Sequence, residues 1–157
     1  MILCYLLVAI SGLGLFQIGL NHYFDFFITN RISFDLIVSI IFIAAQTLVM
    51  FFFVGTGVNI REYLEEHPEL GENLYKRMFA IKRRLYPPTM MVTMLFMAMV
   101  IVDGVFYFGK ISEWWFHILY FLTLYYFYKA TKEQHASFKG STRIVLEMTE
   151  KERQSIS

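Results

Sequence analysis

The sequence predicts an all-α fold: an integral membrane four-helix bundle made of two helical hairpins, with a cytoplasmic amphipathic helical segment between the hairpins. The first observation behind this prediction is the composition. Of the 157 residues, 57% are hydrophobic and only 17% are charged, and the mean hydropathy is +0.49. An ordinary soluble domain has about 25% charged residues. The chain is therefore too apolar for an ordinary soluble domain, and its length suits a single domain.

The second observation is where the charges lie. Of the 27 charged residues, 21 fall in two blocks, residues 61–84 and 129–153. The apolar stretches 1–60 and 89–128 hold only three charges each. A helix needs about 20 residues to cross about 30 Å of hydrocarbon, so each stretch is long enough for two crossings. Each apolar stretch is therefore predicted to form a helical hairpin.

The four predicted spanning segments form one membrane domain that covers residues 1–157. The first segment is expected to be retained rather than cleaved as a signal peptide, because no Lys or Arg precedes it and no small-residue cleavage site follows. Gly55-Thr56-Gly57 is predicted to end the second segment, and Pro87-Pro88 to separate the third from the chain before it. The fourth has a short uncharged run, so Lys129 and Lys132 must extend their stems along apolar neighbours. The predicted segments are residues 2–21, 34–54, 89–108 and 112–131.

Lys and Arg residues predict the orientation. Of the 14 Lys and Arg residues, 12 lie between residues 55 and 88 or after residue 128. Cytoplasmic segments are enriched in Lys and Arg, and these two segments share one side only if four helices cross. Trp114 and Trp115 stand where the fourth helix would enter from the outer interface. We therefore expect both termini in the cytoplasm, in the inner membrane of a bacterium.

The segment of residues 55–88 is predicted to contain an amphipathic helix. Four apolar residues follow helical spacing, namely Leu74, Met78, Ile81 and Leu85. One edge of this helix can therefore lie on an apolar surface. Five basic residues point elsewhere and are predicted to contact lipid headgroups, namely Lys76, Arg77, Lys82, Arg83 and Arg84. The alternative is that these charges only set the topology. The tail, residues 132–157, has a weak apolar edge and is expected to form a short helix resting on the middle segment or on a partner.

Polar residues inside the predicted bundle are the candidate functional residues. Asp103 lies about six residues from the outer end of the third segment, inside the hydrocarbon, where a carboxylate is costly unless it has a partner. Its potential partners are polar side chains expected at a similar depth on neighbouring helices, and His22 and His117 are among them. The predicted buried polar cluster is Asp103, Gln17, Asn21, Asp35 and Ser39.

Four interpretations of these polar residues remain open. The groups can hydrogen-bond one another and hold the helices in register, or they can contact a neighbouring subunit. His22 and His117, on different helices at similar depth, can be axial ligands of a b-type haem. A proton, cation or quinone site that uses Asp103 is the fourth interpretation.

Catalytic motifs are missing from the sequence. It has no G-x-S-x-G, H-E-x-x-H, Walker or Rossmann pattern and no metal-ligand cluster, and its single cysteine, Cys4, is expected to be a buried apolar residue. A net charge of +1 gives no basic surplus for nucleic-acid binding. We therefore expect a non-catalytic accessory or scaffold subunit of a larger membrane complex, with membrane lipids and other integral membrane subunits as partners. The alternatives are a small haem b electron-transfer subunit and a proton- or cation-passing subunit.

Overall fold

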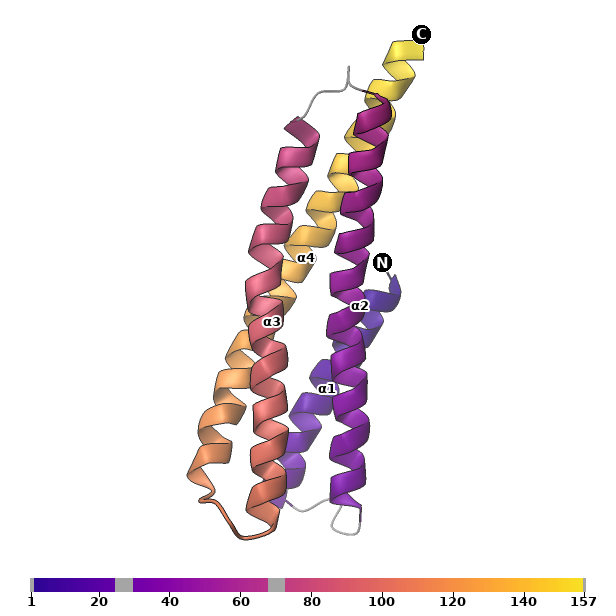
Figure 1. Ribbon diagram of the computed structural model, residues 1–157. Helices are drawn as coiled ribbons and strands as arrows, with labels where there is room; N and C mark the ends of the chain where they lie inside the picture. The colour runs from indigo at the N-terminus through magenta and orange to yellow at the C-terminus, as the bar shows by residue number, and fades with distance from the viewer. Residues whose placement is uncertain (1, 25–29, 68–72, 157) are drawn as a thin grey trace.

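Four helices make up almost all of the described chain. The computed structural model describes residues 2–24, 30–67 and 73–156. The helices are α1 (Ile2–Phe24), α2 (Arg31–Glu66), α3 (Asn73–Tyr107) and α4 (Trp114–Ile156). No strand occurs within these described ranges, so the all-α prediction is confirmed (Figure 1).

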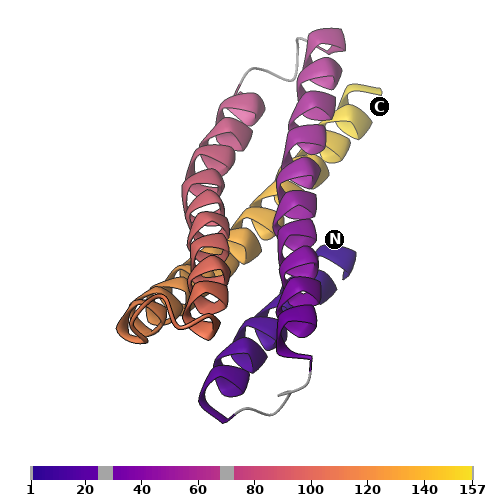
Figure 2. The same cartoon turned by 60° about the horizontal axis from the view of Figure 1, so that its bottom comes forward.

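The helices pack as two hairpins, α1 with α2 and α3 with α4 (Figures 1 and 2). We call the end where α1 meets α2 and α3 turns into α4 the turn end, and the opposite end the C-terminal end. The α3–α4 turn begins with Gly109, whose positive φ of 70° suits glycine. Its N–H donates to the carbonyl of Phe106, and that of Lys110 donates to Val105, which together close a Schellman cap.

Helix length divides the molecule into two parts. α1 has 23 residues, whereas α2, α3 and α4 have 36, 35 and 43. At 1.5 Å per residue, α1 is about 35 Å long and the other helices exceed about 50 Å. The three longer helices therefore extend beyond α1 at the C-terminal end (Figure 1). We call this part, residues 55–66, 73–84 and 139–156, the helical extension.

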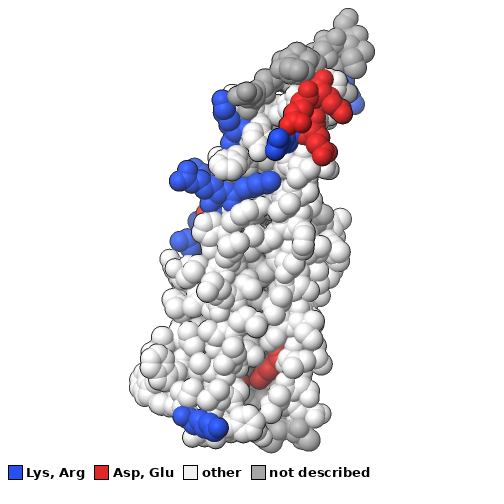
Figure 3. Space-filling view, in the orientation of Figure 1, with Lys and Arg blue, Asp and Glu red and all other residues white. Residues whose placement is uncertain are grey.

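Three of the four helices, α1, α2 and α3, are long and apolar enough to cross a membrane. α4 does not reach the same apolarity, because its first half is rich in Trp and Tyr and its second half is charged. The four-helix architecture is thus present, and three of its helices have the composition of spanning segments. Figure 3 shows the charged residues gathered over the helical extension, with a mostly uncharged surface between them and the turn end.

Gly55-Thr56-Gly57 does not end a helix, contrary to the prediction. α2 continues without interruption to Glu66. The hydroxyl of Thr56 donates to the carbonyl of Phe52, which keeps its side chain inside the helical hydrogen-bond pattern. Buried Phe53 and Ile60, on either side of the glycines, hold this stretch against its neighbours. Tertiary packing therefore overrides the low helix propensity of glycine.

Pro87 and Pro88 do not separate two helices either, because both lie inside α3. A proline deprives the carbonyl four residues earlier of its donor, and here those carbonyls belong to Arg83 and Arg84. Both arginines are exposed, so water can replace the missing donors. Buried Leu85 and Thr89 on either side hold α3 against the bundle. The predicted amphipathic segment is thus the joined ends of α2 and α3, and its apolar edge faces other helices rather than a membrane surface.

The tail continues α4 rather than forming a separate short helix. α4 runs without a break through Gly140, whose missing side chain makes room for Ile81 of α3. Buried Ile144 and Met148 share an apolar core with Leu74 and Met78. The tail therefore packs on α3, which is one of the two contacts expected of it.

The buried apolar residues form two clusters along the bundle. The cluster nearer the turn end includes Leu15, Phe42, Phe96 and Phe116, and its Phe42 and Phe96 rings stack 3.9 Å apart. The other cluster fills the helical extension and its base, where it includes Cys4, as expected for an apolar cysteine. Packing thus continues from the turn end into the charged extension.

Candidate functional site

A buried histidine–carboxylate pair joins α1 to α3 near the turn end. Nδ1 of His22, in the last turn of α1, lies 2.7 Å from Oδ1 of Asp103. The two side chains are only 1% and 4% exposed. The ring of Phe116, from α4, stacks on the His22 ring at 3.7 Å and shields the pair from solvent. With Asp103 ionised, Nδ1 of His22 is the hydrogen-bond donor.

A second hydrogen bond links α1 to α4 beside this pair. The hydroxyl of Tyr23 lies 2.8 Å from Nδ1 of His117, and the two rings stack 5.4 Å apart. Glu113 lies between the two histidines, because its Oε1 is 3.7 Å from Nε2 of His22 and 3.7 Å from Nε2 of His117. These five residues, His22, Tyr23, Asp103, Glu113 and His117, are called the turn-end cluster. It connects α1, α3 and α4.

The two predicted haem ligands are close together, but their geometry favours hydrogen bonding. The His22 and His117 rings lie 6.0 Å apart and nearly perpendicular. Each Nδ1 already faces a hydrogen-bonding partner, and both Nε2 atoms approach the same Glu113 oxygen instead of facing each other across an open space. A porphyrin between them would also have to displace Phe116 from the face of His22. Among the described residues, no group of His, Cys, Asp and Glu is arranged to hold a metal ion.

The other residues of the predicted polar cluster lie on different sides of the bundle. Asn21 is buried beside His22 in sequence, with 1% exposure. Asp35 and Ser39 line a cleft between α2 and α3, and the Ser39 hydroxyl donates to the Asp35 backbone carbonyl at 2.6 Å. Gln17 lines a separate cleft between α1 and α2. Of the potential partners of Asp103, His22 lies within hydrogen-bond distance.

A second polar contact lies deeper in the bundle, and sequence reasoning missed it. The Gln134 amide of α4 donates to the Gln46 side-chain oxygen of α2 at 2.8 Å, and lies 3.4 Å from the Thr89 hydroxyl of α3. All three side chains are buried. Composition predicts that Gln134 belongs to the cytoplasmic tail. Its spacing of four residues from buried Ala130 and Phe138 is the signal in the sequence that indicates a buried position.

The five predicted headgroup-contacting residues have different surroundings. Arg77 binds the Glu147 carboxylate of α4 with both of its terminal nitrogens, the longer bond being 3.1 Å. This guanidinium holds the pKa of Glu147 below its usual range. Lys82 is half-buried and reaches across to Gly57 of α2. The remaining three, Lys76, Arg83 and Arg84, are exposed on α3.

The turn-end cluster can fasten three helices together, because its hydrogen bonds join α1 to α3 and α1 to α4. A carboxylate in low-dielectric surroundings is stabilised by a hydrogen bond from an imidazole or imidazolium N–H. Comparison with known proteins adds no further assignment, since the chain matches no known family and no curated protein or solved structure is significantly similar to it.

Proposed function

We propose that this chain is an integral membrane protein with four spanning helices, and that it serves as a non-catalytic accessory or scaffold subunit of a larger membrane complex. The observation that carries the proposal is that its buried polar groups hydrogen-bond one another between helices. His22–Asp103 joins α1 to α3, and Gln134–Gln46 joins α4 to α2. Each contact fastens helices from different hairpins. Such hydrogen bonds are common supports of membrane bundles.

The position of α4 supports the fourth crossing. Tyr120 occupies the space beside Gly19 of α1, and Phe127 that beside Gly12. The first half of α4 therefore lies at the same level as α1, an apolar helix long enough to span. Its many Tyr and Trp rings suit positions near the two interfaces. Under this proposal α4 crosses the membrane beside α1, and the helical extension is in the cytoplasm with both termini on that side.

Exposed apolar side chains on the helical extension favour protein partners. Phe79 of α3 and Leu146 of α4 are each 59% exposed in a segment that is otherwise rich in charges. Large apolar groups on a water-facing surface are enriched where another protein binds. The extension is therefore the proposed contact surface for partner subunits, in addition to lateral contacts within the membrane.

Co-purification with site-specific controls tests this proposal. The tagged protein, expressed at native level, is crosslinked in intact cells, extracted in mild detergent and analysed for stoichiometric neighbours. We expect a fixed membrane partner whose yield falls with Phe79→Ser or Leu146→Ser, but not with Lys139→Ser, an exposed polar position of the same extension. A chain that is isolated alone, or partners that all three variants retain equally, would contradict the proposal.

Passage of protons or cations through Asp103 is the competing function. An apolar layer lies between the turn-end cluster and the Gln46–Gln134 contact, because Phe42, Val92, Phe96 and Met99 are all fully buried there. This layer weighs against a continuous polar path. Proton or cation flux in vesicles that contain the purified protein, lost in Asp103→Asn while assembly persists, would support passage over the accessory role. A haem-type absorption band from the same preparation would instead favour the electron-transfer alternative.

A further inference from the structure

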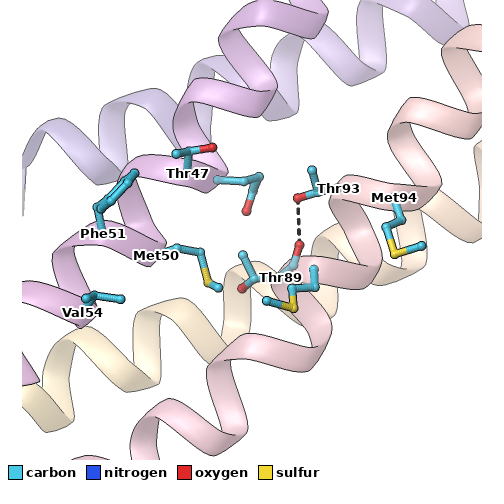
Figure 4. A pocket seen from close by; sticks show the side chains of 9 residues that line it. Thr47, Met50, Phe51, Val54, Thr89, Thr93 and Met94 are labelled. Atoms are coloured by element: carbon cyan, nitrogen blue, oxygen red, sulfur yellow. Dashed lines mark hydrogen bonds between the residues drawn. The ribbon is translucent and has the colours of Figure 1, made fainter.

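A cleft lies between α2 and α3 at residues 46–54 and 89–94. Its volume is about 490 Å³, within the range of ordinary ligand pockets. Figure 4 shows Thr47, Met50, Phe51 and Val54 of α2 facing Thr89, Thr93 and Met94 of α3 across it. The Thr89 and Thr93 hydroxyls donate to the carbonyls of Leu85 and Thr89, at 2.9 Å each. The cleft therefore offers a mainly apolar lining.

Lys82 lies at the cytoplasmic mouth of this cleft. Its side chain crosses from α3 to α2, where Nζ and Cε occupy the space that a side chain on residue 57 would fill. Gly57 follows Val54, the last lining residue of α2, by one helical turn. On α3, Lys82, Tyr86 and Met90 are spaced by four residues and so share one face with the cleft. The absence of a side chain at Gly57 thus creates the seat for the ammonium group.

This ammonium group differs from the neighbouring cations. Arg77 is paired with Glu147, and Arg61 with Glu65 at 2.8 Å, whereas no carboxylate of the described chain lies within salt-bridge distance of Lys82 Nζ. Lys82 is also partly buried, and a partly desolvated charge is stabilised by a counter-ion. A phospholipid has this combination of groups: its acyl chain suits the apolar cleft, and its phosphate suits the ammonium group one helical turn beyond.

We propose that the α2–α3 cleft binds one anionic phospholipid of the cytoplasmic leaflet, with an acyl chain between α2 and α3 and the phosphate group on Lys82. The charge complementarity at the mouth and the apolar lining below it select this occupant. The inference rests on the membrane insertion proposed above and is independent of any partner subunit. It predicts preference for an anionic lipid over a zwitterionic one of the same chain length.

Photocrosslinking in vesicles tests the site. The full chain is reconstituted with phosphatidylglycerol or phosphatidylcholine that bears a diazirine on one acyl chain, and crosslinked peptides are mapped. We expect phosphatidylglycerol to label residues 46–54 and 89–94, and Lys82→Gln to reduce this labelling about fivefold, since one basic residue near the headgroups contributes about 1 kcal/mol. Gly57→Ala keeps the charge but displaces Nζ, and we expect a similar loss.

Arg84→Gln is the matched control, because it removes an equal charge from an exposed position two residues away. An equal loss in this variant would overturn the site in favour of general surface electrostatics. Equal labelling by both lipids, no labelling of the cleft, or competition by inorganic phosphate alone would also overturn it, as would a partner helix found crosslinked there instead. Vesicle flotation separates these outcomes from failed insertion, and circular dichroism shows whether Gly57→Ala is folded.

Discussion

The His22–Asp103 pair shows how one buried carboxylate is accommodated among apolar helices. Both side chains are almost fully buried, so removal of either partner removes a hydrogen bond that water cannot easily replace. The sequence identifies Asp103 as the residue most in need of a partner, and it offers His22 among several candidates at the same depth. It does not select His22 among them, because the rotation of α1 relative to α3 depends on packing over the whole bundle.

Truncation of Asp103 is expected to destabilise the protein. Asp103→Ala should lower the free energy of unfolding by about 1–3 kcal/mol, because it removes a buried hydrogen bond between α1 and α3. Asp103→Asn keeps an acceptor at this position and should cost less, below about 1 kcal/mol. Unfolding in mixed micelles measures both values. Additive effects of Asp103→Ala and His22→Ala in a double-mutant cycle would show that the pair does not contribute as a unit.

The Arg77–Glu147 pair predicts a pH dependence in the helical extension. The pKa of Glu147 is lowered chiefly by its hydrogen bond to Arg77, so the contribution of this pair is present above the usual pKa of glutamate and is lost as the pH falls through the lowered value. Both residues are solvent-accessible, which makes the effect modest. The protection factors of the amides of residues 144–150, which correct for the pH dependence of intrinsic exchange, should therefore fall on acidification in the native protein. In Glu147→Gln the acid-dependent part should disappear, and a persistent pH response would assign it to another group.

At the scale of elements, α4 explains most of the difference between prediction and structure. From Phe116 to Met148, buried positions recur at alternating intervals of four and three residues when half-buried Phe127 is included. This spacing, typical of packed helices, continues across the change from apolar to charged sequence near Lys129. Composition marked that change as a helix boundary. The periodicity of the buried face was the better guide, because burial depends on one face of a helix and composition averages over all of them.

The prolines and glycines misled the boundary predictions for a related reason. Pro87 and Pro88 break helices in isolation, but their cost is limited where the released carbonyls are exposed. Whether a carbonyl is exposed depends on the neighbouring helices, which local sequence does not specify. Helix number and order, set by the two apolar stretches, were predictable, and the continuity of α2, α3 and α4 was not.

Close helix packing at Gly19 gives a test at the element scale. The Tyr120 ring fills the space beside this glycine, so an added methyl group would collide with the ring. Gly19→Ala should destabilise the bundle by about 1–3 kcal/mol through overpacking between α1 and α4. Gly55→Ala is the control, because nothing lies within 4 Å of a Cβ there, and it should be neutral or stabilising by up to about 1 kcal/mol. Equal effects of both changes on thermal stability would show that intrinsic helix propensity, rather than packing, determines the change in stability at these glycines.

For the whole molecule, the bundle combines a mostly uncharged part, to which all four helices contribute, with a charged extension formed by α2, α3 and α4. Figure 3 shows the charges gathered over this extension. The shorter α1 explains this change of width, because it ends where the extension begins. A membrane would surround the wider part, and the extension would stand in water with its exposed apolar residues. The proposal that the extension is cytoplasmic rests on its many Lys and Arg residues.

Site-directed thiol labelling tests this topology in the intact membrane. The single native cysteine, Cys4, is buried and can be replaced by alanine to provide a thiol-free background. Lys110→Cys, in the exposed α3–α4 turn, should react with a membrane-impermeant maleimide in intact cells or spheroplasts. Arg143→Cys, exposed on the extension, should react only after permeabilisation, because both positions are equally open in the folded chain and only the bilayer separates them. The reverse labelling pattern would show that the protein has the opposite orientation. Labelling of both positions without permeabilisation would show that α4 does not cross the membrane, which leaves three crossings instead of four.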